Sequence, residues 1–327
     1  MIRINQASKT RRNHRPTCKK ARYRLRNWSA YNECLVKRGS IDLWINEEDI
    51  GVWKPNTAGK RGGQLLYSDG AIQCMSMVRS VFHLTLRATE GFVESIFKLA
   101  GLELAVPDYT TICRRLRCLE VSLPKNATGP LHAVLDSTGL KVFGEGEWKV
   151  RQHGYSKRRT WRKLHLSVDA DSHEIQAMVL SEPSLDDAGA VPELFDQMTE
   201  PVEQLSADGA YDKKKVYEAC AERGISRVAI PPRKDAHIWQ HGNCAAAPLA
   251  RDENLRRIRK VGRKRWKQEA GYHQRSLAET AIFRFKTIFG AHLKSRRMPQ
   301  QQTETKVKCA ALNRITHLGM PDSYRVM

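Results

Sequence analysis

The hydrophobic periodicity of the chain changes between residues 124 and 130, where the segment Pro-Lys-Asn-Ala-Thr-Gly-Pro interrupts any regular element. Before this break, from Trp28 to about Glu120, apolar residues recur at the three- and four-residue spacing of helices. After it, short apolar or alternating runs typical of strands come first. The chain is therefore predicted to have an all-α part over residues 28–125 and an α/β part over residues 130–320.

The α/β part is predicted to contain a sheet of mixed direction with helices packed on it. Two expected strands flank the turn Asp169-Ala-Asp-Ser-His and form a hairpin, so the sheet is antiparallel at least in part. A polar, basic insertion at about 233–270 has no clear assignment. The expected strands are 131–135, 163–169, 175–180, 202–207 and 228–230, and the expected helices are about 187–198, 212–223 and 272–286.

The charge of the chain points to a polyanionic partner. The chain has 56 Lys+Arg against 35 Asp+Glu, a formal net charge of +21 over 327 residues. An excess of this size favours polyanions through counterion release and electrostatic steering. Nucleic acid is the leading candidate, and no small-molecule substrate is expected. Residues 1–27 hold many of the cations and no acid, and this arm is predicted to be disordered until it meets an anion.

Membrane and disulfide classes are disfavoured by the sequence. No apolar run approaches the roughly 18 residues of a spanning helix, and the N-terminal segment lacks the apolar core of a signal peptide. The eight cysteines are scattered and form no CxxC pair, which argues against a zinc ribbon or a disulfide scaffold. A cytoplasmic protein with free thiols is expected.

A helix-turn-helix is predicted near the end of the all-α part. One helix ends at about Gly101, and another begins after Pro107 with Asp108 as its expected N-cap. The second helix carries Arg114, Arg115 and Arg117, which would face a DNA groove. A helical oligomerisation domain is the alternative.

Two further basic stretches fit DNA without being diagnostic. Residues 149–163 interleave Arg158, Arg159 and Arg162 with aromatic side chains, which suits either stacking of unpaired bases or packing of a strand. Residues 251–267 form a second basic run. It is either a DNA-binding surface or a solvated helix face.

Three acids stand out by their position. Asp136 and Asp208 each end an expected strand, and Glu279 lies on the last expected helix. Acids at the carboxyl ends of adjacent strands are close in space, and a helix packed over that edge can add a third. Converging carboxylates need a counter-charge, and hard oxygen ligands select Mg²⁺ or Mn²⁺. Two such ions would support an in-line phosphoryl displacement. Each acid taken alone is more often a turn or cap residue.

The helix that carries Glu279 has a polar stripe. At about 100° per residue, Tyr272, Arg275, Glu279 and Lys286 fall within roughly 60° of one another. Apolar residues occupy the opposite side, so this helix has one face to bury and one to use. The alternative is a solvated face with ordinary i,i+4 charge pairs.

The spacing Tyr272-x2-Arg275-x3-Glu279-x6-Lys286 resembles the Tyr-Arg-Glu-Lys signature of bacterial insertion-sequence transposases with an Asp-Asp-Glu triad. The segments Leu135-Asp-Ser-Thr-Gly139 and Ala207-Asp-Gly-Ala-Tyr-Asp212 are similar to the two Asp motifs of that family. Trp161-Arg-Lys-Leu-His-Leu-Ser-Val-Asp169 is similar to its strand between the two aspartates. The resemblance covers about Ala21 to Pro321 and is closest to the group named after insertion sequence five.

This resemblance implies a ribonuclease-H-like core and a DNA transposase. It makes Asp136, Asp208 and Glu279 the metal-binding catalytic acids, and Tyr272, Arg275 and Lys286 contacts to DNA phosphates. Larger members of the superfamily carry a long β-rich insertion before the glutamate, whereas 70 residues separate Asp208 from Glu279 here.

The leading hypothesis is therefore a metal-dependent transposase that binds terminal inverted repeats, cleaves the strand and joins the freed 3′-OH to a target. Cutting two element ends together implies a homodimer or larger assembly on double-stranded DNA, in the nucleoid of a bacterium. The alternatives are a transposase-derived DNA-binding regulator without cleavage activity and a stand-alone nuclease of the same fold.

Overall fold

The computed structural model describes residues 22–55, 64–126, 128–142, 161–240 and 248–326. The predicted contacts Arg158 and Arg159 lie outside these residues, as do residues 1–21 of the basic arm. Among the described residues, no helix is both long and apolar enough to cross a membrane.

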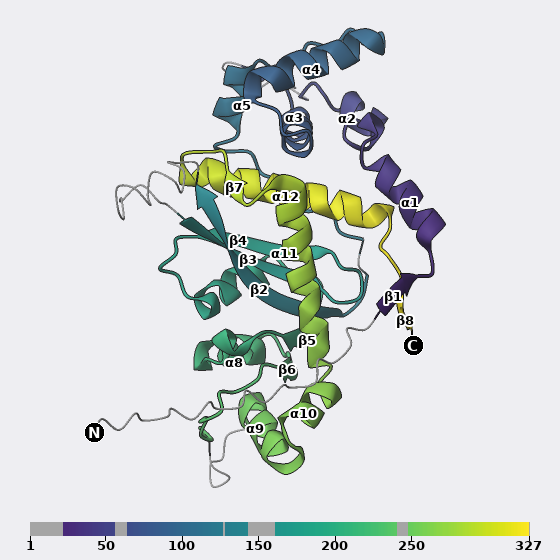
Figure 1. The fold of residues 1–327 in the computed structure, drawn as a ribbon. Coiled ribbons are helices and arrows are strands. Elements are labelled where there is room, and N and C mark those ends of the chain that lie inside the picture. The colour runs from purple at the N-terminus through teal and green to yellow at the C-terminus, as the bar shows by residue number, and fades with distance from the viewer. Residues whose placement is uncertain (1–21, 56–63, 127, 143–160, 241–247, 327) are drawn as a thin grey trace, which may run out of the picture.

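A mixed β-sheet forms the centre of the molecule (Figure 1). Its order is β4-β3-β2-β5-β6, in which β2, β3 and β4 are antiparallel while β5 and β6 run parallel to β2. This confirms the predicted α/β class, and the arrangement is ribonuclease-H-like. The strands are β2 (Leu131–Val142), β3 (Trp161–Asp169), β4 (Ile175–Ser181), β5 (Val202–Ser206) and β6 (Arg227–Ala229).

Strand β2 is longer than its apolar run predicts. The run ends at Asp136, but antiparallel pairing with β3 continues as far as Lys141 and Trp161. The same edge of β2 that holds β5 at residues 131–134 holds the short parallel strand β7 (His292–Leu293) at residues 141–142. Asp136 therefore lies in the middle of a strand. Backbone pairing fixes it more firmly than a strand end would.

The all-α part contains the helices that the periodicity predicts. Side chains cap several of them: Ser68 accepts from Ala71 N at 3.0 Å, and Asp108 accepts from Thr110 N at 2.8 Å. These helices are α1 (Trp28–Lys37), α2 (Glu47–Gly51), α3 (Asp69–Val81), α4 (Leu86–Leu99) and α5 (Tyr109–Arg115), with the 3₁₀ turn η1 (Ile41–Leu43) before α2.

Helices cover both faces of the sheet. One face packs on α7 (Val191–Asp196) and α8 (Lys214–Glu222), with apolar residues such as Leu135 and Leu205 between them. The other face packs on α11 (Ser276–Phe289) and α12 (Met298–Leu318). This second core continues without a break into the all-α part, where Trp44 and Met75 belong to the same cluster. The two parts therefore share one core.

Helix α12 is absent from the sequence-based assignment, although it is the longest helix of the described chain. It lies between α3 and the sheet (Figure 1). Its buried positions include Gln301, Glu304, Lys308 and Asn313, so no apolar stripe marks it. These polar groups are satisfied internally. Glu304 and Lys308 form a buried ion pair at 2.7 Å, and Asn313 bonds to the backbone of Ile175.

The expectation of disorder through residue 27 is wrong for residues 22–27. Arg22–Leu25 form a strand, β1, that pairs antiparallel with β8 (Ser323–Val326) near the other end of the chain. Asn27 then donates to Met320 O at 2.9 Å. Arginines at every second position do not prevent the backbone of residues 22–25 from pairing as a strand. The partner strand β8 lies about 300 residues later, so no local sequence pattern predicts the pairing.

The basic insertion is helical near its end. It contains α9 (Ala250–Val261) and α10 (Arg263–Glu269), which meet at Gly262. The φ angle of Gly262 is +83°, a left-handed conformation that glycine accepts without strain. The 3₁₀ turn η4 (Tyr272–Arg275) connects α10 to α11.

Candidate active site

Asp136 lies within β2, and Asp208 follows the end of the neighbouring parallel strand β5 by two residues. The register pairs Val134 of β2 with Ser206 of β5, and each aspartate follows its paired residue by two positions. Neighbouring strands are about 4.8 Å apart, so the two carboxylates project from adjacent points of the sheet. The sheet topology thus brings together two acids that are 72 positions apart in the sequence.

The local structure holds both aspartates. Asp136 Oδ1 accepts from Ser137 N at 2.8 Å, and Asp208 accepts from Ala210 N at 2.8 Å as the N-cap of the 3₁₀ turn η3 (Gly209–Tyr211). Burial raises the pKa of Asp136, and the charges of Asp208 and Glu279 add to the rise, against the opposing effects of the Ser137 N–H and Arg275. A nearby cation would therefore stabilise the ionised form of Asp136.

Glu279 faces these acids from the first turn of α11, a helix that contacts β2 and β3. Its carboxylate forms an i,i+4 ion pair with Arg275. The Glu279 side chain is 51% exposed, whereas that of Arg275 is 23% exposed. Glu279 and Arg275 thus form the i,i+4 charge pair that the alternative interpretation predicts. Both charges also act on Asp136.

The predicted polar stripe is divided between two elements. Tyr272 and Arg275 belong to the 3₁₀ turn η4, and only Glu279 and Lys286 lie on α11 itself. The Tyr272 ring packs against Trp266 with centroids 6.0 Å apart, and Lys267 Nζ lies 4.9 Å from the ring centroid. Burial raises the pKa of the Tyr272 phenol, and the three acids raise it further against the effect of Arg275. The phenol therefore stays protonated.

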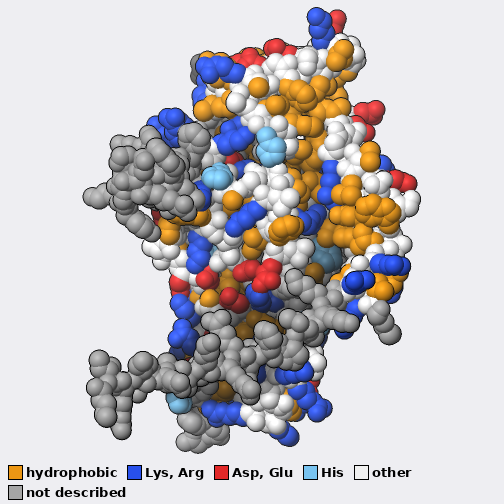
Figure 2. All heavy atoms as spheres, in the orientation of Figure 1, with side chains coloured by type: hydrophobic (Ala, Val, Ile, Leu, Met, Phe, Trp, Pro, Cys, Tyr) orange, Lys and Arg blue, Asp and Glu red, His pale blue; other side chains and the backbone are white. Residues whose placement is uncertain are grey.

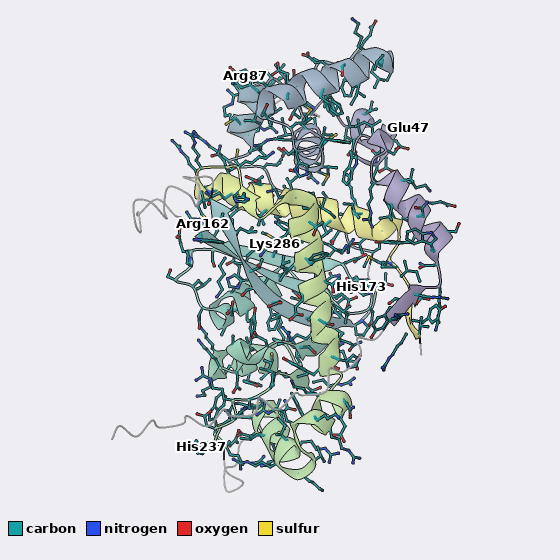
Figure 3. All side chains as sticks on the ribbon, in the orientation of Figure 1. Glu47, Arg87, Arg162, His173, His237 and Lys286 are labelled. Atoms are coloured by element: carbon teal, nitrogen blue, oxygen red, sulfur yellow. The ribbon has the colours of Figure 1, made fainter. Side chains whose placement is uncertain are left out.

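Lys286 reaches the same face of β2 as Asp136. Its Nζ donates to Thr138 Oγ1 at 2.5 Å, two residues beyond Asp136 on the strand. Figure 3 shows Lys286 on the upper part of α11, beside the sheet. The site thus joins three carboxylates with Arg275 and Lys286. Figure 2 shows a small acidic group near the middle of this face, among many lysines and arginines.

The donor set fits a divalent metal in its chemistry, because it offers carboxylate oxygens alone. Within the described residues, however, no three acidic, histidine or cysteine side chains stand close enough together to hold an ion as they are. The ion pair with Arg275 engages the Glu279 carboxylate. The pair uses Glu279 Oε1, so a metal held by all three acids would share this carboxylate with Arg275 or displace it.

A second layer of polar residues behind β2 was not expected from the sequence. Asp187, in the 3₁₀ turn η2 (Asp187–Ala190), pairs with Lys163 at 2.8 Å and lies 3.5 Å from His165 Nδ1. Burial alone would raise the Asp187 pKa, but bonds from His165, Lys163 and Ser137 hold it below its usual range. Two adjacent acids, Asp186 and Asp187, were the only sequence signal.

Tyr211 also lies near the acids. The sequence motif around Asp208 contains this tyrosine but predicts no role for it. Its side chain is 1% exposed, and its hydroxyl is buried without a hydrogen-bond partner. Burial raises the pKa of this phenol, and the charges of Asp187, Asp136 and Asp208 raise it further. Tyr211 therefore keeps a proton that it can donate toward the carboxylates.

Two predicted DNA contacts are wrong because their guanidinium groups are used inside the protein. Arg115 bonds to Asp69 Oδ1 at 2.6 Å and to Tyr67 O at 2.9 Å, and its side chain is 10% exposed. Arg162 bonds to Gln301 and to Glu182, each at 2.9 Å, and its side chain is 11% exposed. Both arginines connect elements of the fold.

The helix-turn-helix is not formed in the predicted way. Nine residues separate α4 from α5, whereas the motif uses a turn of about three or four. Helix α5 has seven residues and ends before Arg117. Arg114 and Arg117 are nevertheless exposed, and their role as DNA contacts stays a prediction.

Several cations of the second basic run are paired with acids inside the protein. Arg251 pairs with Asp212 at 2.8 Å and with Asp252 at 3.3 Å, and all three side chains are nearly inaccessible. Arg257 and Arg265 both pair with Glu269, at 2.8 and 3.1 Å. The solvated or structural interpretation therefore describes much of this run better than a DNA-binding surface does.

Comparisons with known families agree with the geometry. A family model described as a transposase DDE domain matches residues 127–314, which is more than half of the chain. A second model with the same description matches residues 36–145. The first of these spans Asp136, Asp208 and Glu279.

Two solved structures align with the chain at low similarity. The piggyBac transposase, in a synaptic complex with hairpin DNA, is 10% identical and aligns with a TM-score of 0.41 over 86% of this chain and 73% of that one. The Drosophila P element transposase, in a strand transfer complex, is 10% identical and aligns with a TM-score of 0.29 over 83% of each chain.

Proposed function

The chain belongs to the transposase DDE domain family, whose members are DNA enzymes that transfer phosphoryl groups, and from this premise we propose that it is the transposase of a bacterial insertion sequence. In this proposal it binds the terminal inverted repeats of its element, cleaves the DNA strand and joins the freed 3′-OH to target DNA. The Tyr272-Arg275-Glu279-Lys286 spacing supports placing it in the insertion-sequence-five group.

One observation carries this proposal above the others. Asp136 on β2 and Asp208 just beyond the adjacent parallel strand β5 lie near each other, and the charge of Glu279 on α11 acts on the same site. Turn or cap roles would explain any one of these acids. They do not explain why two strands and a helix from distant parts of the sequence direct acids to one point, where ionised carboxylates repel one another.

Enzymes of this family typically use divalent metal ions, and we propose Mg²⁺, with Mn²⁺ able to replace it. Asp136, Asp208 and Glu279 would hold the metal. When bound, it lowers the pKa of a water or hydroxyl nucleophile and stabilises the leaving oxygen. Arg275 lies beside these acids, where it would contact a phosphate of the bound strand.

The remaining residues of the site position DNA in this proposal. Lys286 places its ammonium group beside Thr138, close to where a phosphate would approach Asp136. Tyr272 offers a protonated phenol as a hydrogen-bond donor. Each such contact fixes the strand relative to the carboxylates without reading its sequence. Two element ends require two cores, so at least a homodimer forms on DNA.

The decisive test is Mg²⁺-dependent cleavage of a duplex that carries an element end. We expect Asp136→Asn to lower the cleavage rate at least about 10³-fold while binding of the duplex persists. Asp196→Asn, which changes an acid that is 82% exposed on α7, is the matched control and should cleave like the wild type. Cleavage by Asp136→Asn at the control rate would contradict the catalytic assignment.

The alternatives make different predictions in the same assay. A DNA-binding regulator would bind the element end but leave it uncut even as the wild-type protein. A stand-alone nuclease would cut unrelated duplexes as fast as element ends. Short inverted repeats and a target duplication in the DNA that flanks the coding region would favour the transposase independently.

A further inference from the structure

A large groove lies on the surface where the all-α part meets β7, away from the carboxylates. Its cavity volume is about 1140 Å³, and it lies between α4 and α5 on one side and β7 and the segment leading to α12 on the other. Apolar residues line part of it, among them Leu84, Leu86 and Leu293. The lining also includes six cations: Arg79, Arg87, Arg114, Arg117, Lys294 and Arg296. No acid lines it among the described residues.

The six cations lack acidic partners. Within the described chain none of them forms an ion pair, in contrast to Arg115, Arg162 and Arg251. Arg79 Nε is buried without a hydrogen-bond partner. The Lys294 ammonium donates to the backbone oxygens of His83 at 3.2 Å and Leu84 at 3.4 Å, while the Lys294 backbone N–H donates to the Glu304 carboxylate. Burial, Arg79 and Lys308 lower the pKa of Lys294. These like charges repel one another, and a bound anion would reduce this electrostatic repulsion.

The shape and chemistry of the groove fit the backbone of DNA. A sugar–phosphate chain alternates apolar sugars with anionic phosphates, and the groove is lined by both apolar side chains and cations. Figure 2 shows basic side chains gathered between α5 and β7, and Figure 3 shows Arg87 near the start of α4 above them. The guanidinium of Arg87 lies 4.2 Å from the Tyr109 ring centroid, so it is already oriented over the groove wall.

Backbone pairing fixes the separation between the groove and the carboxylates. Leu293, in the groove, pairs with Val142 at the end of β2, and Asp136 lies six residues earlier on that strand. A strand advances about 3.3 Å per residue, so the groove begins roughly 20 Å from Asp136. DNA advances about 3.4 Å per base pair, and the same span therefore holds about six base pairs.

We propose that this groove binds the phosphate backbone of the duplex whose phosphodiester occupies the carboxylate site, about six base pairs from the cleaved bond. The inference rests on the proposed function, because it needs DNA at the carboxylates. It adds a second point of attachment, to which both parts of the chain contribute. Two fixed points on one duplex set its direction across the protein.

The test compares two double variants of the full-length protein. Arg87→Gln with Arg296→Gln removes one groove cation from each wall. Lys98→Gln with Arg297→Gln removes two exposed cations close to them in sequence, on α4 and beside Arg296, that do not line the groove. Both double variants carry Asp136→Asn, so that cleavage does not disturb binding. Affinity for an element-end duplex is measured across a salt series, and protected phosphates are mapped.

The groove variant should reduce the salt slope of log K by about 2, one unit for each lost phosphate contact. Protection about six base pairs from the cleavage position should weaken with it. The control variant should leave both unchanged. Equal slopes in the two variants, or undiminished protection at that distance, would overturn the proposal while leaving the carboxylate site intact.

Failure of the proposed function has a different signature. In that case the Asp136→Asn parent itself would show no preference for element ends over unrelated duplexes. An acidic protein segment is the other possible occupant of the groove. Sedimentation without DNA tests it, because a groove variant that loses self-association but keeps its salt slope would identify a protein interface and overturn the DNA assignment.

Discussion

The helices α9–α10 and α11 follow one another in the chain but use their cations differently. Helices α9 and α10 are rich in cations, whereas α11 carries Arg284 and Lys286. In α9 and α10, Arg251, Arg257 and Arg265 are paired with acids. In α11, Lys286 has a neutral hydroxyl as its recorded partner, while Glu279 shares its carboxylate with Arg275. The first region uses its charge to hold the fold, and the second keeps it beside the acids of the core.

The difference between these regions comes from what surrounds each cation. Arg251 lies where Asp212 and Asp252 are also buried, and buried charges persist only when they are paired. Lys286 approaches β2 at Thr138, where no acid is directly opposite and the carboxylates lie further along the strand. A count of basic residues does not separate these cases. Four predictions test the contrast, from the largest effect to the smallest.

Glu279→Gln should abolish activity without weakening the fold. The amide keeps the size of the side chain and can still bond to Arg275, but it loses the charge that a metal ligand needs. We expect Mg²⁺-dependent cleavage to fall at least about 10³-fold. Cleavage assays and thermal unfolding measure the two effects. Cleavage near the wild-type rate would make Glu279 a plain helical charge-pair residue.

Arg251→Met should destabilise the protein by about 3–5 kcal/mol, because it leaves Asp212 and Asp252 buried without their cation. Arg265→Met, at a side chain that is 71% exposed, is the control and should cost less than about 1 kcal/mol. Urea unfolding of the metal-free protein gives both values. A small loss for Arg251→Met, together with a weaker salt dependence of DNA binding, would move α9 into the DNA-binding class.

Lys286→Met should lower cleavage about tenfold and reduce the salt slope of DNA binding by about 1, as expected for one phosphate contact. Thr138→Val removes the hydroxyl that bonds to Lys286 Nζ but leaves the cation in place. We therefore expect a much smaller change in slope for this variant. Equal slopes for the two variants would show that Lys286 acts only through its bond to β2.

Asp136→Asn should slightly stabilise the metal-free protein at neutral pH. The pKa of Asp136 is raised in the fold, so the folded state holds this proton more tightly than the unfolded chain does. Its contribution to stability is present below the unfolded pKa and is lost as the pH rises through the folded pKa. The Asp136→Asn amide cannot ionise, so the variant does not lose this stability at neutral pH. Thermal unfolding should show a rise of about 1–3 °C at pH 7, and a fall there would contradict the sign.

Local patterns in the sequence determined much of the fold and the outline of the site. The break at residues 124–130, the hairpin at 163–180 and the cap Asp108 were predicted, because each depends on neighbouring residues. The sequence predicted that Asp136 and Asp208 each end a strand, whereas the structure places Asp136 within β2 and Asp208 just beyond β5.

Only the tertiary structure decided which charges are free. Arg115 is buried because it bonds to Asp69 of another helix, whereas its neighbour Arg114 is exposed. Arg162 is held by Gln301, which lies on a helix without an apolar stripe. The pairing of β1 with β8, and the groove between the all-α part and β7, join residues that are far apart in the sequence. The sequence by itself determined elements and the acids they carry, because those rest on short-range periodicity. Partners of buried and exposed cations are long-range contacts, and packing alone selects them.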